Sequence, residues 1–542
     1  MRTFRMAAGL CLGMIVQVPV AGQGGIGSPL IPLEVSRPVG LERAWHAQLA
    51  IDAARARVEQ VTIHVNQTET LTVYDVTDGD KTVSFTEHHT DRFGVPLGPA
   101  GAAREAERRM LVLRAQGGQP KLATRNIPRV TLYVVTSLGI VHALDGETGA
   151  TRWVVRIGHA NYPTLAPGAS DGRLAIVNGS TLYVLDPASG RTLWERKLGG
   201  GPGAGPALSD EYVFVPLLSG ELEAYGLKNP VERPWIYKSA GRALVQPTVT
   251  PSSVSWPTDR GLMYVANANH VGIRFRLETR ETIDSASSYL GPYYLLVASV
   301  DGYAYCVQEV SSDLLWRYSA GSPIRQAPIP IGDAVHVITD RDGMCCVSLD
   351  KGEERWWAPS VTGFLAASRD RIYVSDRTGQ ITVLDARSGG RIASMPGQYV
   401  DLRVPNLLTD RVYVGSRTGT IQCLREIGAV WPTIHLYDSV EAKKKPEIVQ
   451  KVEPEGPPPL PPGRPPGGDD PFGGAGADNP FAAGAPPQPD KAPDQDDPLA
   501  GPPAVPPAGP DAAPPPPGGG PPVTPPAGAD NPFGAPDDDP FK

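Results

Sequence analysis

Arg371-Ile-Tyr-Val-Ser-Asp-Arg-Thr-Gly379-Gln-Ile-Thr-Val-Leu-Asp385 is the stretch of this 542-residue chain that decides its fold. Two β-rich runs, 372–375 and 381–384, flank a polar segment that ends in Gly379, and this pattern predicts a hairpin. The next five residues, Asp385-Ala-Arg-Ser-Gly389, predict a second turn with glycine where a positive φ is needed. The unit therefore predicts three short strands joined by two tight turns.

The same unit recurs eight times along the chain. Its turn glycines are Gly139, Gly179, Gly220, Gly261, Gly302, Gly343, Gly379 and Gly419, separated by 40, 41, 41, 41, 41, 36 and 40 residues. A closing residue follows each pair of turns: Trp153, Trp194, Trp235, Phe275, Trp316, Trp357, Ile392 and Trp431. A fixed period of this length with about four short strands per unit predicts an all-β fold, an eight-bladed β-propeller. One large ring per unit is suited to fill the wedge between neighbouring blades.

The run from Leu182-Tyr-Val-Leu-Asp186 to Trp194 resembles the PQQ-like (BamB-like) propeller repeat, and the resemblance covers about residues 129–435. It implies the propeller fold. It does not decide the function, because that superfamily holds both quinoprotein dehydrogenases and catalytically inert scaffolds.

Residues 40–436 are predicted to form the propeller, with an insertion at about residues 67–128 in its first blade. A helix over 40–49 is possible on propensity, but we favour a strand, because Trp45 would then close a blade built from both chain ends. Within the insertion, 71–76 and 82–86 predict a hairpin, and 102–115 predicts a charged helix. Long insertions in repeat folds often carry partner contacts, so this one is a candidate binding element.

A secretory signal is predicted over residues 1–22, followed by a flexible N-terminus over 23–39. Arg2 and Arg5 form a basic start, an apolar run follows, and small residues precede Gly22. The apolar run is too short to span a membrane comfortably, and lipid attachment at Cys11 is disfavoured because the residue just before it is not small. We therefore expect an exported protein, periplasmic or envelope-associated, without a transmembrane span.

The C-terminal part has a different composition. After a linker over 437–451, residues 452–542 are rich in proline, glycine and aspartate, and we expect this tail to be disordered. Its fourteen acidic and three basic residues give −11; the whole chain carries −8, so residues 1–451 sum to +3. A nearly neutral folded body argues against nucleic-acid binding.

Four short motifs of the tail end in phenylalanine, at Phe472, Phe481, Phe533 and Phe541. Each ring follows Asp-Pro or Asp-Asn-Pro, which favours a turn. Two interpretations stay open: a low-complexity tail that repeats by duplication, or a multivalent binding segment that gains from effective concentration.

The one pattern that suggests catalysis is Cys345-Cys346, since quinoprotein alcohol dehydrogenases, as the resemblance implies, place a vicinal disulfide beside their quinone. Those enzymes also need a calcium or lanthanide site, a catalytic aspartate and a tryptophan floor, none of which we can place here. The pair lies in an ordinary repeat strand, and Cys306 and Cys423 occupy equivalent repeat positions where small apolar residues stand elsewhere. We favour buried free thiols over disulfides, and the histidines show no metal spacing.

We therefore expect a monomeric, non-catalytic propeller that binds protein partners through its loops, the insertion and the tail. The specific form of this hypothesis is a role in envelope or outer-membrane protein assembly. It would need no catalytic, cofactor or metal residues. The repeated architecture would rest on Trp153, Trp194, Trp235, Trp316, Trp357 and Trp431 and on Gly139, Gly302, Gly343, Gly379 and Gly419. The alternative is a PQQ-dependent dehydrogenase or a degenerate relative of one.

Overall fold

The protein is described from a computed structural model, which covers residues 30–435 except 80 and 92. The predicted signal, linker and tail, with the four tail phenylalanines, lie outside the described residues. Among the described residues, no helix is long and apolar enough to cross a membrane.

The described chain is all-β apart from two helices and one 3-10 turn, and its strands form eight antiparallel sheets. The helical elements are α1 (Leu33–Ser36), η1 (Arg37–Val39) and α2 (Gly98–Ala115). Sheet 1 has the order β3-β2-β4-β5-β6, with β2 (Val58–Asp78), β3 (Lys81–Thr86), β4 (Lys121–Thr136), β5 (Ile140–Asp145) and β6 (Thr151–Arg156). Sheet 2 contains β7 (Gly168–Ala169), β8 (Leu174–Asn178), β9 (Thr181–Leu185) and β10 (Thr192–Lys197).

Sheets 3 to 5 each contain four strands in chain order. Sheet 3 contains β11 (Ala207–Leu208), β12 (Tyr212–Pro216), β13 (Glu221–Gly226) and β14 (Trp235–Lys238). Sheet 4 contains β15 (Thr248–Val249), β16 (Ser253–Pro257), β17 (Leu262–Asn267) and β18 (Ile273–Glu278). Sheet 5 contains β19 (Ser288–Leu290), β20 (Tyr294–Ala298), β21 (Tyr303–Gln308) and β22 (Leu314–Ser319).

The last three sheets bring the two ends of the described chain together. Sheet 6 contains β23 (Ile329–Ile331), β24 (Ala334–Thr339), β25 (Gly343–Ser348) and β26 (Glu354–Ala358). Sheet 7 contains β27 (Val361–Ala367), β28 (Arg371–Asp376), β29 (Ile381–Asp385) and β30 (Arg391–Met395). Sheet 8 has the order β1-β33-β32-β31, with β1 (Leu41–Gln48), β31 (Leu402–Val404), β32 (Val412–Gly415) and β33 (Thr420–Glu426).

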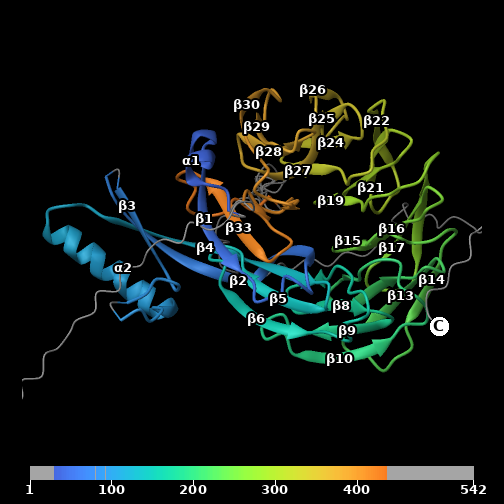
Figure 1. Cartoon of the computed structure of the whole chain (residues 1–542), viewed down its shortest axis with the longest axis horizontal. Coiled ribbons are helices and arrows are strands. Elements are labelled where there is room, and N and C mark those ends of the chain that lie inside the picture. The colour runs from blue at the N-terminus through green and yellow to red at the C-terminus, as the bar shows by residue number, and fades with distance from the viewer. Residues whose placement is uncertain (1–29, 80, 92, 436–542) are drawn as a thin grey trace, which may run out of the picture. The chain divides into compact units, whose positions relative to one another are not determined.

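The N-terminal strand β1 completes the sheet that the C-terminal strands begin. It runs antiparallel to β33, from Leu41 opposite Glu426 to Gln48 opposite Thr420. Figure 1 shows the sheets following one another around a ring in chain order, with β1 and β33 side by side where the ring meets itself. Eight sheets of this kind are consistent with a β-propeller.

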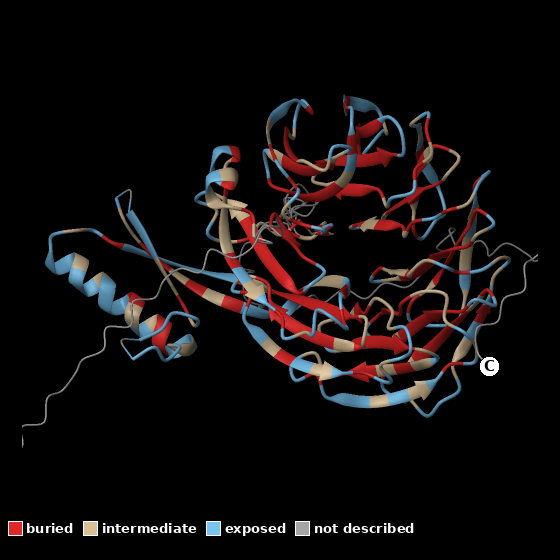
Figure 2. Ribbon diagram, in the orientation of Figure 1, coloured by how far each residue is buried: buried red, intermediate tan, exposed pale blue. Residues whose placement is uncertain are grey.

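The middle strands of each sheet are apolar on both faces because a neighbouring sheet covers each face. In β28, Tyr373 packs in one cluster with Val412 of sheet 8, whereas the next residue, Val374, packs in another with Trp356 of sheet 6. Successive strand residues point to opposite faces, so one apolar run supplies two wedges of core. Figure 2 shows this burial in the middle strands and greater exposure in the outer ones.

The insertion in sheet 1 is an extension of its strands. Strands β2 and β4 pair from Val58 opposite Thr136 to Thr77 opposite Lys121, with β3 added at the far end. Helix α2 packs beside β2 and β3, burying its small residues Ala102 and Ala106. We call residues 70–127 the arm, and Figure 1 shows it projecting from the ring of sheets.

Candidate functional site

Four tryptophans join one sheet to the next by the same pair of contacts. The indole Nε1 donates to a backbone carbonyl of the following sheet at 2.7–3.1 Å: Trp45 to Gly146, Trp153 to Pro187, Trp316 to Leu349 and Trp356 to Ala386. Each ring also lies against a turn glycine, three residues after the residue whose carbonyl it contacts. Gly149 and Gly389 are examples, and a Cβ at either position would overlap the ring. These glycines have φ near +70°, so both the close approach and the backbone conformation favour glycine.

The predicted ring of the sixth unit is off by one residue. Trp357 is 52% exposed, whereas Trp356 is 7% exposed and faces Cys346 across the ladder, as Trp316 faces Cys306. In each of these turns the carbonyl of one residue accepts a hydrogen bond from the N–H of the turn glycine; this residue is Asp145 in sheet 1 and Ser348 in sheet 6. The inter-sheet tryptophan lies eight residues after it. The equivalent turn residues Gln308 and Ser348 are 40 positions apart, so counting 41 residues from Trp316 selected the wrong indole.

The predicted ring of the eighth unit is also corrected. Trp431 lies beyond β33 and packs against Leu71, Val73 and Ile127 at the base of the arm. Trp45 occupies the inter-sheet position instead, opposite Cys423, because β1 supplies the outer strand of sheet 8.

The other predicted structural residues lie at matching positions. Trp153, Trp194, Trp235 and Trp316 each lie on the outermost strand of their sheet, opposite Ala143, Val184, Ala224 and Cys306. Gly139, Gly302, Gly343, Gly379 and Gly419 all have positive φ at the turn between the second and third repeat strands. In the seventh unit Ala393, and not the half-exposed Ile392, stands opposite Val383.

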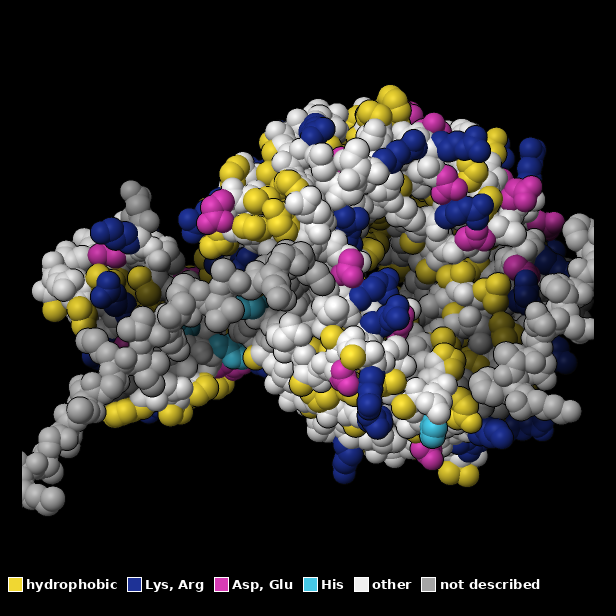
Figure 3. Space-filling view, viewed as in Figure 1, with side chains coloured by type: hydrophobic (Ala, Val, Ile, Leu, Met, Phe, Trp, Pro, Cys, Tyr) yellow, Lys and Arg dark blue, Asp and Glu magenta, His cyan; other side chains and the backbone are white. Residues whose placement is uncertain are grey.

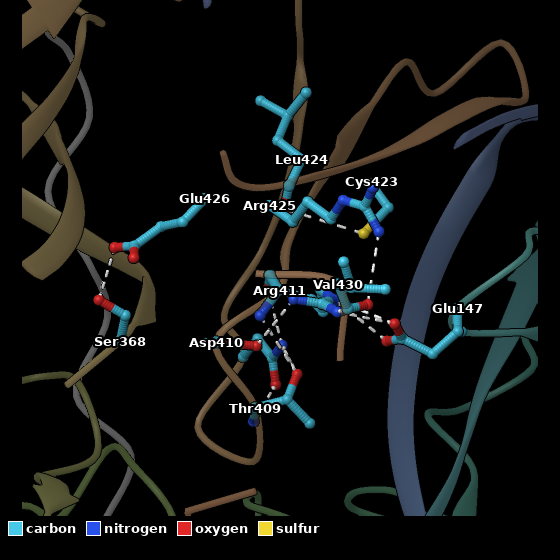
Figure 4. Close-up of polar contacts among 12 residues, drawn as sticks. Glu147, Ser368, Thr409, Asp410, Arg411, Cys423, Leu424, Arg425, Glu426 and Val430 are labelled. Atoms are coloured by element: carbon cyan, nitrogen blue, oxygen red, sulfur yellow. Dashed lines mark hydrogen bonds and ion pairs between the residues drawn. The ribbon is translucent and has the colours of Figure 1, made fainter. Parts of the chain in front are cut away.

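The junction between sheets 8 and 1 carries a buried ion cluster that the sequence analysis missed. Arg411 is fully buried, and its guanidinium contacts Glu147 at 2.9 Å and Asp410 at 3.2 Å (Figure 4). It also donates to the carbonyl of Val430 at 3.0 Å. Burial alone would lower the pKa of Arg411, but the two carboxylates outweigh it and raise that pKa. The cluster ties the two ends of the ring together.

The base of the arm is fixed to sheet 2 by one carboxylate. Asp171 accepts hydrogen bonds from the backbone N–H groups of Gln67 and Thr68 at 2.9–3.2 Å, and from His64 at 3.1 Å. The donating segment is a bulge, where β2 skips from Asn66 to Thr70 in its pairing with β4. These hydrogen bonds fix the bulge at the base of the arm to sheet 2.

Several large apolar side chains of the arm are exposed. Phe93 is 74% and Leu111 65% exposed, and Val95, Val112 and Leu122 are exposed as well. Figure 3 shows hydrophobic and basic side chains side by side on this part of the molecule. A group of exposed large apolar side chains on one element is typical of an interaction surface.

A cavity of about 350 Å³ lies between sheets 6 and 7, near the last described residues. His336 lines it, is 3% exposed, and places its Nδ1 3.2 Å from the carbonyl of Ile329. A carbonyl only accepts, so Nδ1 carries the proton; burial lowers the pKa of His336 to about 4, which leaves Nε2 an unprotonated acceptor. No described residue bonds to that Nε2.

The cavity has a structural explanation in the repeat. Tyr373 and Tyr413 occupy the position of His336 in sheets 7 and 8, and their hydroxyls reach the next sheet, at Glu426 and at the carbonyl of Gly146. The shorter imidazole does not reach the corresponding residue, Ala386, which also lines the cavity. This difference is visible in the sequence: when the second strands of the repeats are aligned, His336 stands where Tyr373 and Tyr413 stand in the next two repeats.

The four described cysteines are buried and unbridged. Cys306, Cys346 and Cys423 take equivalent ladder positions, each opposite an inter-sheet tryptophan. Burial raises the pKa of Cys306 and of Cys346 to about 12, so these thiols stay protonated and unreactive at neutral pH. In residues 30–435, apart from 80 and 92, no three histidine, cysteine or acidic side chains are grouped as metal ligands.

Comparisons with known proteins give a family and similar folds. The family model described as outer membrane protein assembly factor BamB matches residues 118–229, 178–282 and 289–427, more than half of the chain. A crystal structure of BamB from Moraxella catarrhalis is 17% identical, with a TM-score of 0.46, and the match covers 54% of this chain and 91% of that one. The computationally designed Ika8 protein is 15% identical, with a TM-score of 0.45 and coverage of 54% and 92%. No curated protein matches the chain.

Proposed function

We propose that this chain, which belongs to the family described as outer membrane protein assembly factor BamB, is an exported, non-catalytic scaffold for protein–protein interaction in the cell envelope. Its eight sheets are the blades of one closed propeller, and the arm is its principal partner-binding element. A role in outer-membrane protein assembly is the specific form of this proposal, drawn from the printed description of the family.

The arm is the observation that carries the proposal. It is anchored at its base by Asp171, yet it exposes Phe93 in the loop before α2 and Leu111 on α2. A fixed element that exposes apolar side chains pays little ordering entropy when it binds, which favours recognition. The middle strands of the sheets bury their apolar residues and serve as the rigid support.

The absence of catalysis is part of the proposal and rests on the cysteines. Cys345 and Cys346 lie on consecutive positions of β25, so their side chains point to opposite faces, and Cys346 takes the place that Cys306 and Cys423 hold elsewhere. A role in packing accounts for the pair without a cofactor.

The test compares single surface variants of the full chain in affinity capture from envelope extracts. Leu111→Asp and Phe93→Asp should each lose a partner that the parent protein retains. Val231→Asp, at another exposed apolar residue outside the arm, is the matched control and should retain it. A partner retained equally by all three variants would remove the arm from the proposal.

A further inference from the structure

The cavity between sheets 6 and 7 has no part in the function proposed above, and it is independent of the arm. His336 lines it, and the buried Nε2 of this histidine is an acceptor without a partner among the described residues. In sheets 7 and 8 a tyrosine hydroxyl fills the corresponding place and bonds across the junction. A buried acceptor without a donor costs free energy, so a molecule that donates a hydrogen bond there would be stabilised.

The rim of the cavity is positively charged. Arg355, Arg369 and Arg387 line it from three separate places: strand β26, the turn before β28 and the turn before β30. The single acidic lining residue is Asp333, which pairs with Arg355 at 3.0 Å. Asp370 stands near Arg387 at 3.7 Å, and Arg369 has no ion pair with any residue of the described part.

The remaining walls combine apolar and hydroxyl groups. Ile331, Ala334 and Ile372 give aliphatic contact, and Thr433 adds a hydroxyl. A cavity of about 350 Å³ suits a ligand of the size of a monosaccharide. The cavity is partly open, and its lining mixes apolar, hydroxyl and charged groups.

We propose that this cavity is a binding site for a small organic anion that carries hydroxyl groups. A hydroxyl donates to the Nε2 of His336, and the carboxylate or phosphate faces Arg369 and Arg387 at the rim. Charge and hydroxyl are both required, because the cations lie at the rim and the acceptor lies inside.

The first experiment titrates the full chain with four probes, followed by calorimetry and thermal shift. D-Glucuronate and D-glucose 6-phosphate have both features and separate a carboxylate from a phosphate ligand. D-Glucose has the hydroxyl groups but no charge, and cyclohexanecarboxylate has the charge but no hydroxyl groups. We expect one of the first two to bind with a dissociation constant below about 1 mM, and each control to bind at least about tenfold more weakly.

The second experiment changes the cavity. Arg369→Gln should weaken binding about tenfold, whereas Arg391→Gln, on the same sheet but away from the cavity, should leave it unchanged. His336→Tyr should abolish binding and raise the melting temperature, because the new hydroxyl reaches towards Ala386 as Tyr413 reaches Gly146. If His336→Tyr fails to fold, the arginine pair still decides the matter.

Three results would overturn the proposal. They are no saturable binding of either anion up to about 10 mM, equal binding of glucose or cyclohexanecarboxylate, and unchanged binding in Arg369→Gln.

Discussion

The junction between sheets 8 and 1 and the junction between sheets 6 and 7 use the same repeat positions in different ways. In the first, Tyr413 and Trp45 both bond to the carbonyl of Gly146, and Arg411 adds a buried ion cluster. In the second, Trp356 makes the same contact with Ala386, but His336 falls short and a cavity remains. The filled junction closes the ring, while the hollow one leaves room for a ligand. A single side chain at one repeat position thus decides whether a junction is filled or hollow.

The largest expected effect comes from the ion cluster of the closing junction. Arg411→Leu leaves the carboxylates of Glu147 and Asp410 without their buried cation, and we expect it to lower the free energy of unfolding by about 3–5 kcal/mol. Urea unfolding measures this. The double variant Arg411→Leu with Glu147→Leu should recover part of the loss, since it removes one of the stranded charges. A loss below about 1 kcal/mol in the single variant would mean that the cluster does not hold the ring closed.

The inter-sheet indole is tested by two adjacent residues. Trp356→Ala removes a buried ring that bonds to Ala386 and should cost about 3–5 kcal/mol. Trp357→Ala changes a half-exposed ring on the other face of the strand and should cost about 1 kcal/mol or less. The pair is its own control in thermal or urea unfolding. Equal losses would contradict the assignment of Trp356 to the wedge.

The buried His336 at the junction between sheets 6 and 7 should make the free energy of unfolding depend on pH. Burial lowers the pKa of His336 to about 4 in the folded chain, against 6.5 for an ordinary histidine. The unfolded chain therefore binds the extra proton first, and stability is present above pH 6.5 and is lost as the pH falls towards 4. The full effect is about 3 kcal/mol. The difference in unfolding free energy between the parent protein and His336→Tyr, followed over this range, isolates it from the carboxylates; a constant difference would contradict it.

The smallest effect concerns the hollow junction at neutral pH. His336→Tyr removes an unpartnered acceptor and fills space, so we expect a gain of about 1 kcal/mol in unfolding free energy. The matched change at the filled junction, Tyr413→His, should instead destabilise, because it opens a cavity and breaks the bond to Gly146. Urea unfolding of both variants gives the comparison. A loss in His336→Tyr would show that the histidine is packed for its own contacts.

The repeat, the arm and the closing strand could be predicted from the sequence because each leaves a local pattern. Periodic glycines and alternating apolar runs specify the sheets, and β1 was recognisable from Trp45. The errors at Trp357 and Trp431 have a common cause. A count of residues cannot see which of two adjacent indoles points inward, and it runs on to Trp431 although Trp45, predicted to close the same blade, already fills that position.

The cavity and the ion cluster were harder to predict because they depend on residues far apart in the chain. Arg411 and Glu147 are 264 positions apart and meet only when the ring closes. Asp171 likewise meets the bulge after Asn66 across two sheets. The cavity results from a missing length of side chain, which becomes visible when His336 is compared with Tyr373 and Tyr413.

Titration of the purified protein with PQQ in the presence of calcium, followed by visible absorbance and thermal shift, separates a scaffold from a quinone enzyme most directly. We predict no saturable absorbance change and no rise in melting temperature at high micromolar PQQ. Saturable binding with a raised melting temperature would contradict the scaffold and make the dehydrogenase the better description of this propeller.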